Sequence, residues 1–140
     1  MAESKIDVLL RISEANLARA EKRLEDAEFD SAVFHASMAV EAAANAMILQ
    51  LGGDEARDHR AISGLAAVLR RVKPELLRKR EYLQLIEKGR EIQREVIYTR
   101  YPVSVEGRWV APMEYYTREN TTLVVENAKF VVGTIRRYLE

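Results

Sequence analysis

Three polar side chains interrupt an alanine-rich stretch of the sequence, and their spacing places them on one helical face. Ser37, Glu41 and Asn45 are four residues apart, the interval that aligns side chains along a helix. A carboxylate on an otherwise apolar helix must be paired or hydrogen-bonded, because an isolated buried charge is costly. The pattern therefore predicts either a structural polar ladder or one wall of a ligand cleft, and the residue types leave both open.

A basic counterpart to this face lies further along the chain. Arg90, Arg94 and Tyr98 also recur every four residues, and Tyr101 follows Arg94 by two turns. A guanidinium group is a planar fork that suits carboxylate and phosphate groups. We expect Glu41 to form an ion pair with Arg94 across the bundle, because both lie near the middle of helices predicted to form the core.

The charge distribution favours the same part of the chain. The whole sequence is neutral, but residues 52–100 hold 12 Lys and Arg against 8 Asp and Glu, whereas residues 1–51 carry a net charge of −4. The middle segment is therefore the place where an anionic ligand would bind, but a charge excess of this size is typical of an ordinary solvated basic face.

Several classes of site are excluded by what the sequence lacks. There is no cysteine, and the two histidines, His35 and His59, are far apart in sequence, so we expect neither a metal site nor a cofactor. Each histidine is predicted to be structural, with His59 capping or packing at a helix start. No glycine-rich phosphate loop and no convincing helix-turn-helix is present, and no apolar run is long enough to span a membrane. These absences predict a cytoplasmic protein that binds neither DNA nor membranes.

The apolar periodicity is helical almost throughout. It predicts helices over residues 4–26, 28–51, 59–72, 75–100 and 118–139, with a break in the fourth near residue 79. The aromatic segment 101–116 is predicted to be an ordered loop. The fold class is therefore an all-α, antiparallel up-and-down bundle of four to five helices.

A series of short motifs also runs in a defined order along the chain. From residue 27 the sequence reads A-x-F-D-x-A-x-F-H-A-x-x-A-x-E-x-x-x-N-A, and H-x-x-I-x-x-L, Y-x-R-Y-P, Y-Y-T and E-x-A begin at residues 59, 98, 115 and 126. Their order and spacing resemble the HEPN domain family (higher eukaryotes and prokaryotes nucleotide-binding). The resemblance covers nearly the whole chain, so residues 1–140 are expected to form a single HEPN-like helical domain.

This resemblance implies a helical bundle that is commonly a homodimer, with a groove lined by polar residues of its second and fourth helices. It implies nucleotide or RNA binding, and a gene pair with a minimal nucleotidyltransferase, as in toxin–antitoxin systems. The resemblance also implies a possible activity. Catalytically active members of the family are metal-independent ribonucleases, in which an arginine is followed four to six residues later by a histidine.

The chain departs from that ribonuclease motif, because no histidine follows His59. Imidazole is the side chain that changes charge near neutral pH, whereas arginine stays protonated. We therefore expect a non-catalytic module that binds a nucleotide or RNA, with Glu41 orienting Arg94 and with Ser37 and Asn45 on the supporting polar face. The expected ligand contacts are Arg90, Arg94, Tyr98, Arg100 and Tyr101.

Two other functions remain open at this point. One is a metal-independent ribonuclease toxin that uses Tyr101 or a remote His35 as its base. The other is a structural dimerisation partner that binds no ligand. In that case the aromatic segment around Trp109 would contact another protein, such as a nucleotidyltransferase.

Overall fold

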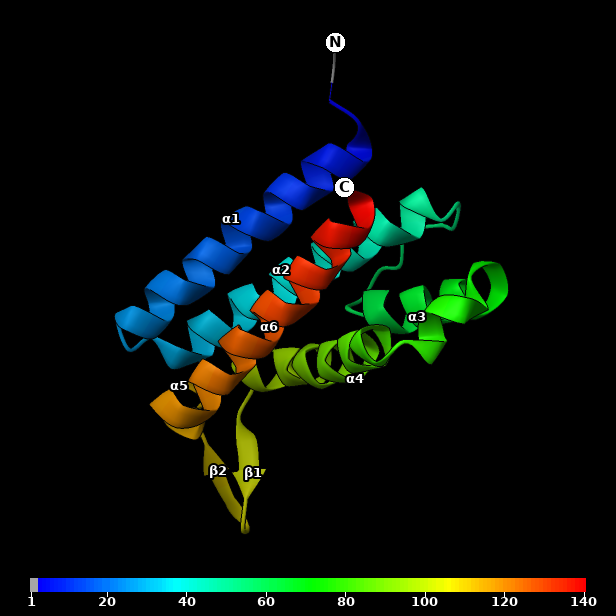
Figure 1. The fold of residues 1–140 in the computed structure, drawn as a ribbon. Coiled ribbons are helices and arrows are strands. Elements are labelled where there is room, and N and C mark those ends of the chain that lie inside the picture. The colour runs from blue at the N-terminus through cyan, green and yellow to red at the C-terminus, as the bar shows by residue number, and fades with distance from the viewer. Residues whose placement is uncertain (1–2) are drawn as a thin grey trace.

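The structure, a computed structural model that describes residues 3–140, consists of helices and one small hairpin (Figure 1). In chain order the elements are α1 (Lys5–Glu25), α2 (Phe29–Gln50), α3 (Ala61–Val72), the 3-10 helix η1 (Pro74–Arg78), α4 (Arg80–Glu95), the 3-10 helix η2 (Val96–Thr99), β1 (Val103–Val105), β2 (Arg108–Val110), α5 (Pro112–Tyr115) and α6 (Arg118–Leu139). The predicted all-α bundle is confirmed, with α1, α2, α4 and α6 as its long helices and α3 as a shorter fifth.

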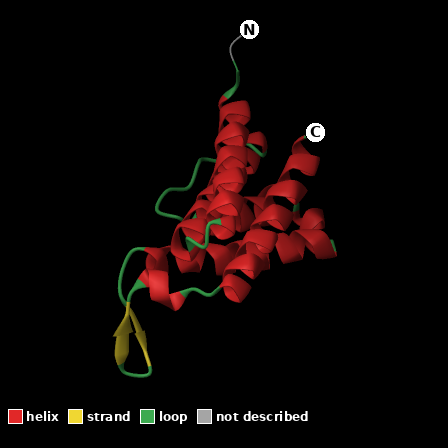
Figure 2. Ribbon diagram, turned by 90° about the vertical axis from the view of Figure 1, so that its left-hand side faces the viewer, coloured by secondary structure: helices red, strands yellow, loops and turns green. Residues whose placement is uncertain are grey.

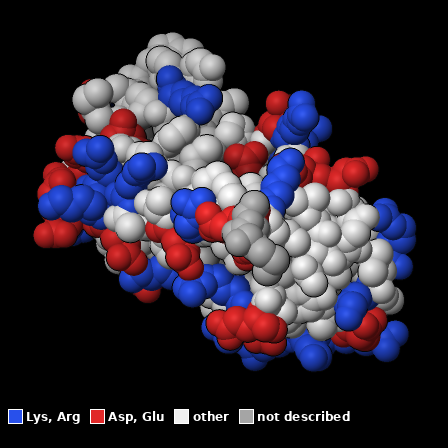
Figure 3. Space-filling view, turned by 90° about the horizontal axis from the view of Figure 1, so that it is seen from above, with Lys and Arg blue, Asp and Glu red and all other residues white. Residues whose placement is uncertain are grey.

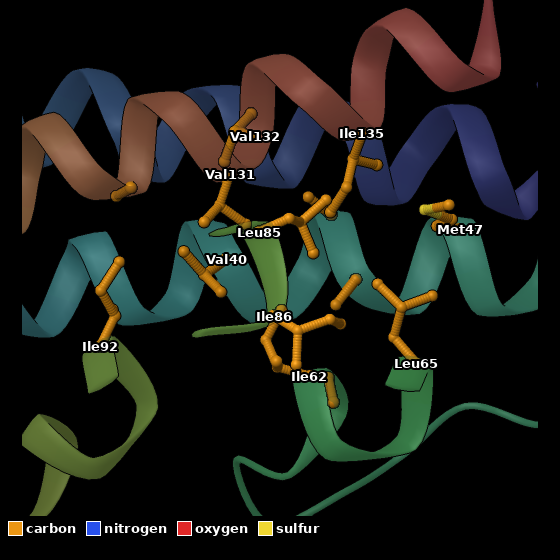
Figure 4. Packing of buried hydrophobic residues seen from close by; sticks show 14 of the residues in the cluster. Val40, Met47, Ile62, Leu65, Leu85, Ile86, Ile92, Val131, Val132 and Ile135 are labelled. Atoms are coloured by element: carbon orange, nitrogen blue, oxygen red, sulfur yellow. The ribbon is translucent and has the colours of Figure 1, made fainter. Parts of the chain in front are cut away.

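Helix α2 is the centre of this bundle and is buried along most of its length. Its seven alanines are all buried, and their small side chains allow α1, α3, α4 and α6 to pack against it. Val40 and Met47 of α2 face the same core as Leu65 of α3, Leu85 of α4 and Ile135 of α6 (Figure 4). Any polar side chain on α2 therefore lies at or near the core.

The apolar character of α2 also gives it the length and composition of a membrane-spanning helix. Its 18-residue window has a mean hydropathy of 1.4, but 72% of that window is buried inside the bundle. The neighbouring helices bury most of α2, as they would the core helix of a bundle.

The helix ends follow local capping chemistry. Ser4 and Asp7 form a capping box at the start of α1, and Thr117 and Asn120 form another at the start of α6. The third helix begins at Ala61, two residues later than predicted. The predicted helix 75–100 is divided into η1, α4 and η2, with the expected break near residue 79.

The segment predicted to be an ordered loop contains a β-hairpin instead, so that prediction was wrong in part. Strands β1 and β2 pair antiparallel, with Val103 opposite Val110. Glu106 and Gly107 both have positive φ (49° and 76°), as a two-residue type I′ turn requires. Three-residue strands are too short to give a clear alternating pattern. The hairpin extends away from the helices (Figure 2), and Trp109 on it is 77% exposed.

Helices α3 and α4 approach closely at Gly89. A Cβ atom built on Gly89 would lie 2.6 Å from Cδ1 of Ile62, so this position has no room for a side chain. Ile62 is itself fully buried and points into the core (Figure 4). The glycine therefore sets the distance between the two helices.

We predict that Gly89→Ala destabilises the protein by about 1–3 kcal/mol, because the added methyl group overpacks the α3–α4 contact. Gly133→Ala is the matched control, since its new Cβ would meet only Nη1 of Arg137 at 3.6 Å. That change should stabilise α6 by about 0.5–1 kcal/mol through helix propensity. Urea unfolding measures both, and equal effects of the two substitutions would contradict the close approach.

Candidate functional site

The connection between α2 and α3 is held against α2 by two residues of the predicted polar ladder. The side-chain amide of Asn45 donates to the carbonyl oxygen of Ala56 (3.1 Å), and its oxygen accepts the Ala56 N–H (2.9 Å). Glu41 Oε1 accepts the backbone N–H of His59 (3.1 Å). These bonds replace the partners that a loop backbone otherwise lacks. Asn45 is therefore a structural clamp, as one of the two sequence interpretations predicted.

The end of this loop has an unusual backbone. Asp58 and His59 have φ values of 60° and 61°, in the left-handed region that most residues avoid. Such conformations persist only where the surroundings impose them, and they are frequent at functional sites. Here the Glu41 bond to His59 supplies part of that constraint.

The carboxylate of Glu41 also lies beside the imidazole ring of His59. Oε2 is 3.3 Å from Nδ1, close enough for a charge interaction, although the geometry does not make a hydrogen bond. The predicted Glu41–Arg94 ion pair is therefore wrong. Within residues 3–140, no carboxylate lies within 4.0 Å of the Arg94 guanidinium, and the loop carrying His59 takes the place beside Glu41 that Arg94 was predicted to fill.

Gln93 of α4 contacts the start of α3, directly after the loop. Its Oε1 accepts the backbone N–H of Ile62 (3.0 Å), which fixes the orientation of the amide. The residue is 7% exposed, and its Nε2 has no hydrogen-bond partner among the described residues. A buried amide donor without a partner is costly, so this group is an unsatisfied donor at the contact between α3 and α4.

Two adjoining hollows lie between the loop and α4. One, of about 400 Å³, is lined by Asp58, His59, Arg60, Gln93, Arg94, Val96, Ile97, Arg100 and Tyr101. The other, of about 240 Å³, is lined by His59, Arg60, Ser63, Arg90, Gln93 and Arg94. Four residues belong to both, and we refer to the combined space as the arginine pocket.

The arginine pocket is positively charged and its charges are unpaired. Within residues 3–140, none of the guanidinium groups of Arg60, Arg90, Arg94 and Arg100 lies within 4.0 Å of a carboxylate, and Arg100 rests 5.0 Å from the ring centroid of Phe34. Elsewhere, Arg11, Arg23 and Arg136 each pair with a glutamate. The face that carries the chain ends shows basic and acidic side chains interspersed (Figure 3). Unpaired guanidinium groups around one hollow therefore make the arginine pocket favourable for an anion, although the Asp58 carboxylate also lines it.

The far end of α4 is anchored by Tyr116. Its hydroxyl donates to Oε2 of Glu95 at 2.7 Å, next to Arg94 in sequence. Burial, and then this hydrogen bond, raise the pKa of Tyr116 well above its ordinary value. The phenol therefore stays neutral and keeps donating, which holds the end of α4 in place.

The structure brings together some of the predicted contacts and not others. Arg94, Arg100 and Tyr101 line the larger hollow, and Arg90 lines the smaller one. Tyr98 lies outside both, because its ring packs on Tyr115 with centroids 5.8 Å apart.

Two further residues with predicted roles are also absent from the pocket lining. Ser37 is fully buried. His35, considered above as a remote base, bonds Asn16 of α1 through Nδ1 at 2.9 Å. Burial, with the charges of Arg19 and Arg23, lowers the pKa of His35. Both residues therefore belong to the packing of α2 and not to the arginine pocket.

Sequence reasoning missed the pocket roles of His59, Arg60 and Gln93. For His59 it predicted capping or packing, because the approach of this residue to α4 depends on the loop conformation. Gln93 gave one detectable signal, since it is a polar residue next to Ile92 on the buried side of an amphipathic helix. Within the described residues no group of three or more His, Asp or Glu side chains could hold a metal ion.

Comparison with known proteins identifies relatives along nearly the whole chain. The family described as the HEPN domain matches residues 6–138. A protein named "Putative toxin MJ1304", from Methanocaldococcus jannaschii, is 26% identical over 133 residues, which are 95% of this chain and 87% of that protein. The crystal structure of TT1696 from Thermus thermophilus superposes with a TM-score of 0.74 at 21% identity, covering 96% of this chain and 98% of that one. The structural similarity shows a shared fold.

Proposed function

The chain belongs to the HEPN domain family, and we propose that it binds phosphate groups of RNA or of a nucleotide in the arginine pocket. The observation that carries this proposal is the convergence of Arg60, Arg94 and Arg100 on one open hollow without a carboxylate partner. Charge-assisted hydrogen bonds from guanidinium groups to phosphate oxygens are among the strongest polar contacts in proteins. The cytoplasmic location expected from the sequence is where such ligands occur.

Two neutral groups complete this binding site. The unpartnered Nε2 of Gln93 supplies a donor for a phosphate or base oxygen, and its orientation is already fixed by Ile62. Tyr101 is 60% exposed at the pocket edge, so its ring is available to stack on a base. The ligand would then meet charge, a fixed donor and an aromatic face within one hollow.

A second candidate function is metal-independent RNA cleavage, and one observation favours it. The sequence provides no histidine after Arg94, but the fold supplies His59 to the same pocket, with Glu41 beside its Nδ1. A carboxylate beside Nδ1 favours a proton on that nitrogen, which leaves Nε2 to act as a general base. The relative from Methanocaldococcus jannaschii is named as a toxin, which is compatible with this activity.

In this cleavage reaction, the ribose 2′-oxygen attacks the adjacent phosphorus and gives its proton to Nε2 of His59. The bond from phosphorus to the 5′-oxygen breaks, and that oxygen takes a proton from water. The products are a 2′,3′-cyclic phosphate and a 5′-hydroxyl, while Arg94 and Arg100 stabilise the charge on the phosphorane oxygens.

The proposal also includes association of the chain with other protein chains. The family resemblance supports a homodimer and a minimal nucleotidyltransferase partner. The hairpin offers an exposed apolar surface, with Val105 39%, Trp109 77% and nearby Met113 70% exposed. We propose that a second copy of the chain covers this surface, because large exposed apolar side chains of this kind mark protein contacts.

We predict that Arg94→Ala weakens RNA binding by about 1.5–3 kcal/mol, roughly a 10- to 150-fold loss, because one charge-assisted phosphate contact is removed. Gln93→Glu should cause a similar loss, since it keeps an acceptor for Ile62 N–H but turns the free donor into a negative charge. Calorimetric titration with mononucleotides and with short RNA shows which of these two ligands the protein binds. Arg71→Ala, an exposed arginine outside the pocket, is the charge-matched control, and equal affinity of wild type and Arg94→Ala would refute the assignment.

For cleavage, we predict that wild-type protein cuts single-stranded RNA in the presence of EDTA and that His59→Ala lowers the rate roughly 100-fold or more, because the general base is lost. Glu41→Gln should lower it less, since the amide oxygen still accepts the His59 N–H. His35→Ala serves as the control and should retain activity. Intact RNA after incubation with folded, RNA-binding wild type would leave binding alone as the function.

For self-association, we predict that wild type sediments as a dimer and that Trp109→Ser shifts it to monomer without lowering the melting temperature. The indole is exposed, so its loss should remove intermolecular contact and little intramolecular packing. Leu123→Ser, which removes another exposed apolar side chain on α6, should leave the dimer intact. A Trp109→Ser protein that remains dimeric would exclude the hairpin as the contact between copies.

A further inference from the structure

We propose that the arginine pocket continues along the groove between α3 and α4, and that this groove holds the neighbouring nucleotides of a single-stranded oligonucleotide. The inference rests on the proposed phosphate binding and extends it, because it distinguishes a strand of several nucleotides from a mononucleotide. The groove supplies a place for further bases, beyond the one that Tyr101 can stack at the edge of the arginine pocket.

A third hollow, of about 660 Å³, provides this groove. It is lined by Ala66, Arg70, Leu77, Leu83, Ile86, Glu87, Arg90, Glu91 and Arg94. Arg90 also lines the smaller hollow of the arginine pocket, and Arg94 lines both of its hollows. The three spaces therefore adjoin along one side of α4, and the two arginines stand where they meet.

The spacing of the lining residues shows that the groove follows the helix axes. On α3, Ser63, Ala66 and Arg70 recur at steps of three and four after Arg60. Ten residues of helix span about 15 Å at 1.5 Å per residue. One strand of a duplex advances roughly 3.4 Å per nucleotide, and an unstacked strand is at least as extended, so the groove has the length of at most about four nucleotides.

The floor of the groove is formed by side chains packed beneath it. Ile62 of α3 occupies the space that the missing side chain of Gly89 leaves on α4. Ile86 and Ala66 are buried at 7% and 1% exposure and present apolar surface to the hollow. The groove is consequently a shallow channel with an apolar floor and not a slot through the molecule.

The chemistry of the walls matches a base beside a phosphate. Leu83 is 52% exposed, although it lies beside a strongly charged region. Within the described residues, neither Arg70 nor Arg90 has a carboxylate within 4.0 Å, so both can contact phosphate. Glu87 and Glu91 line the same hollow and repel phosphate there, which favours an uncharged base over the apolar floor with its amino groups facing the carboxylates.

An unpaired strand fits this surface better than a duplex. Base faces are available to apolar side chains only where the bases are not stacked inside a helix, and contacts to such faces tolerate any sequence. Arginines on the rim then follow the backbone while Leu77 and Leu83 contact a base. We therefore expect recognition of single-stranded RNA with little sequence preference.

Fluorescence anisotropy with labelled RNAs of one to six nucleotides tests the groove. Affinity should rise at least tenfold between one and four nucleotides and then level off, and a six-base-pair duplex should bind more weakly than the single strand. Leu83→Asp should weaken hexanucleotide binding roughly tenfold and leave mononucleotide binding unchanged, because it removes the apolar base contact and adds a negative charge in the groove and not in the arginine pocket. Leu123→Asp, which adds the same charge at another exposed leucine on α6, should leave both affinities unchanged.

The outcomes separate the groove from the pocket. Arg70→Ala should lower the slope of log affinity against log salt by about 0.7 for the hexanucleotide alone. Equal affinity for one and six nucleotides, with no effect of Leu83→Asp, would overturn the groove and leave the phosphate pocket intact. Failure of every length to bind would overturn both. A Leu83→Asp protein with altered sedimentation and unchanged RNA affinity would make the groove a contact between protein chains and refute the proposal.

Discussion

The carboxylate of Glu41 and the amide of Asn45 hold the α2–α3 loop against the core helix, and the candidate site depends on that attachment. Without it, the backbone of residues 56–59 would have no fixed position relative to α4. His59 and Arg60 would then not face Gln93 and Arg94 across one hollow. Two residues of the polar ladder thus position one wall of the proposed site through their bonds to the loop backbone.

The alanine composition of α2 has a related consequence. Because the side chains of α2 are small, four helices pack around it, and buried polar groups on it need partners that the neighbouring helices do not supply. The hydroxyl of Ser37 has none among the described residues. Glu41 and Asn45 satisfy this requirement with loop backbone, whereas Arg94 stays unpaired among the described residues. The free arginine charge at the site follows from the carboxylate being used elsewhere.

The sequence predicts the helices well, because periodicity is a local property that each segment expresses by itself. The helices predicted over residues 4–26 and 118–139 correspond to α1 and α6, within one residue at each end. The hairpin was missed because its strands are three residues long. Among the site residues, the helical positions of Arg90 and Arg94 could be anticipated. The position of His59 could not, because it depends on two consecutive left-handed residues and on a tertiary hydrogen bond.

The two walls of the arginine pocket come from different kinds of element, and this difference affects how a ligand would bind. One wall of the arginine pocket comes from a loop with mostly exposed residues, and the other comes from a rigid helix. Regions with few buried contacts open before the rest of a protein unfolds, and in this loop the bonds to Asn45 and Glu41 oppose such opening. A ligand that bridges both walls would close that opening, and its affinity therefore includes the free energy of ordering the loop.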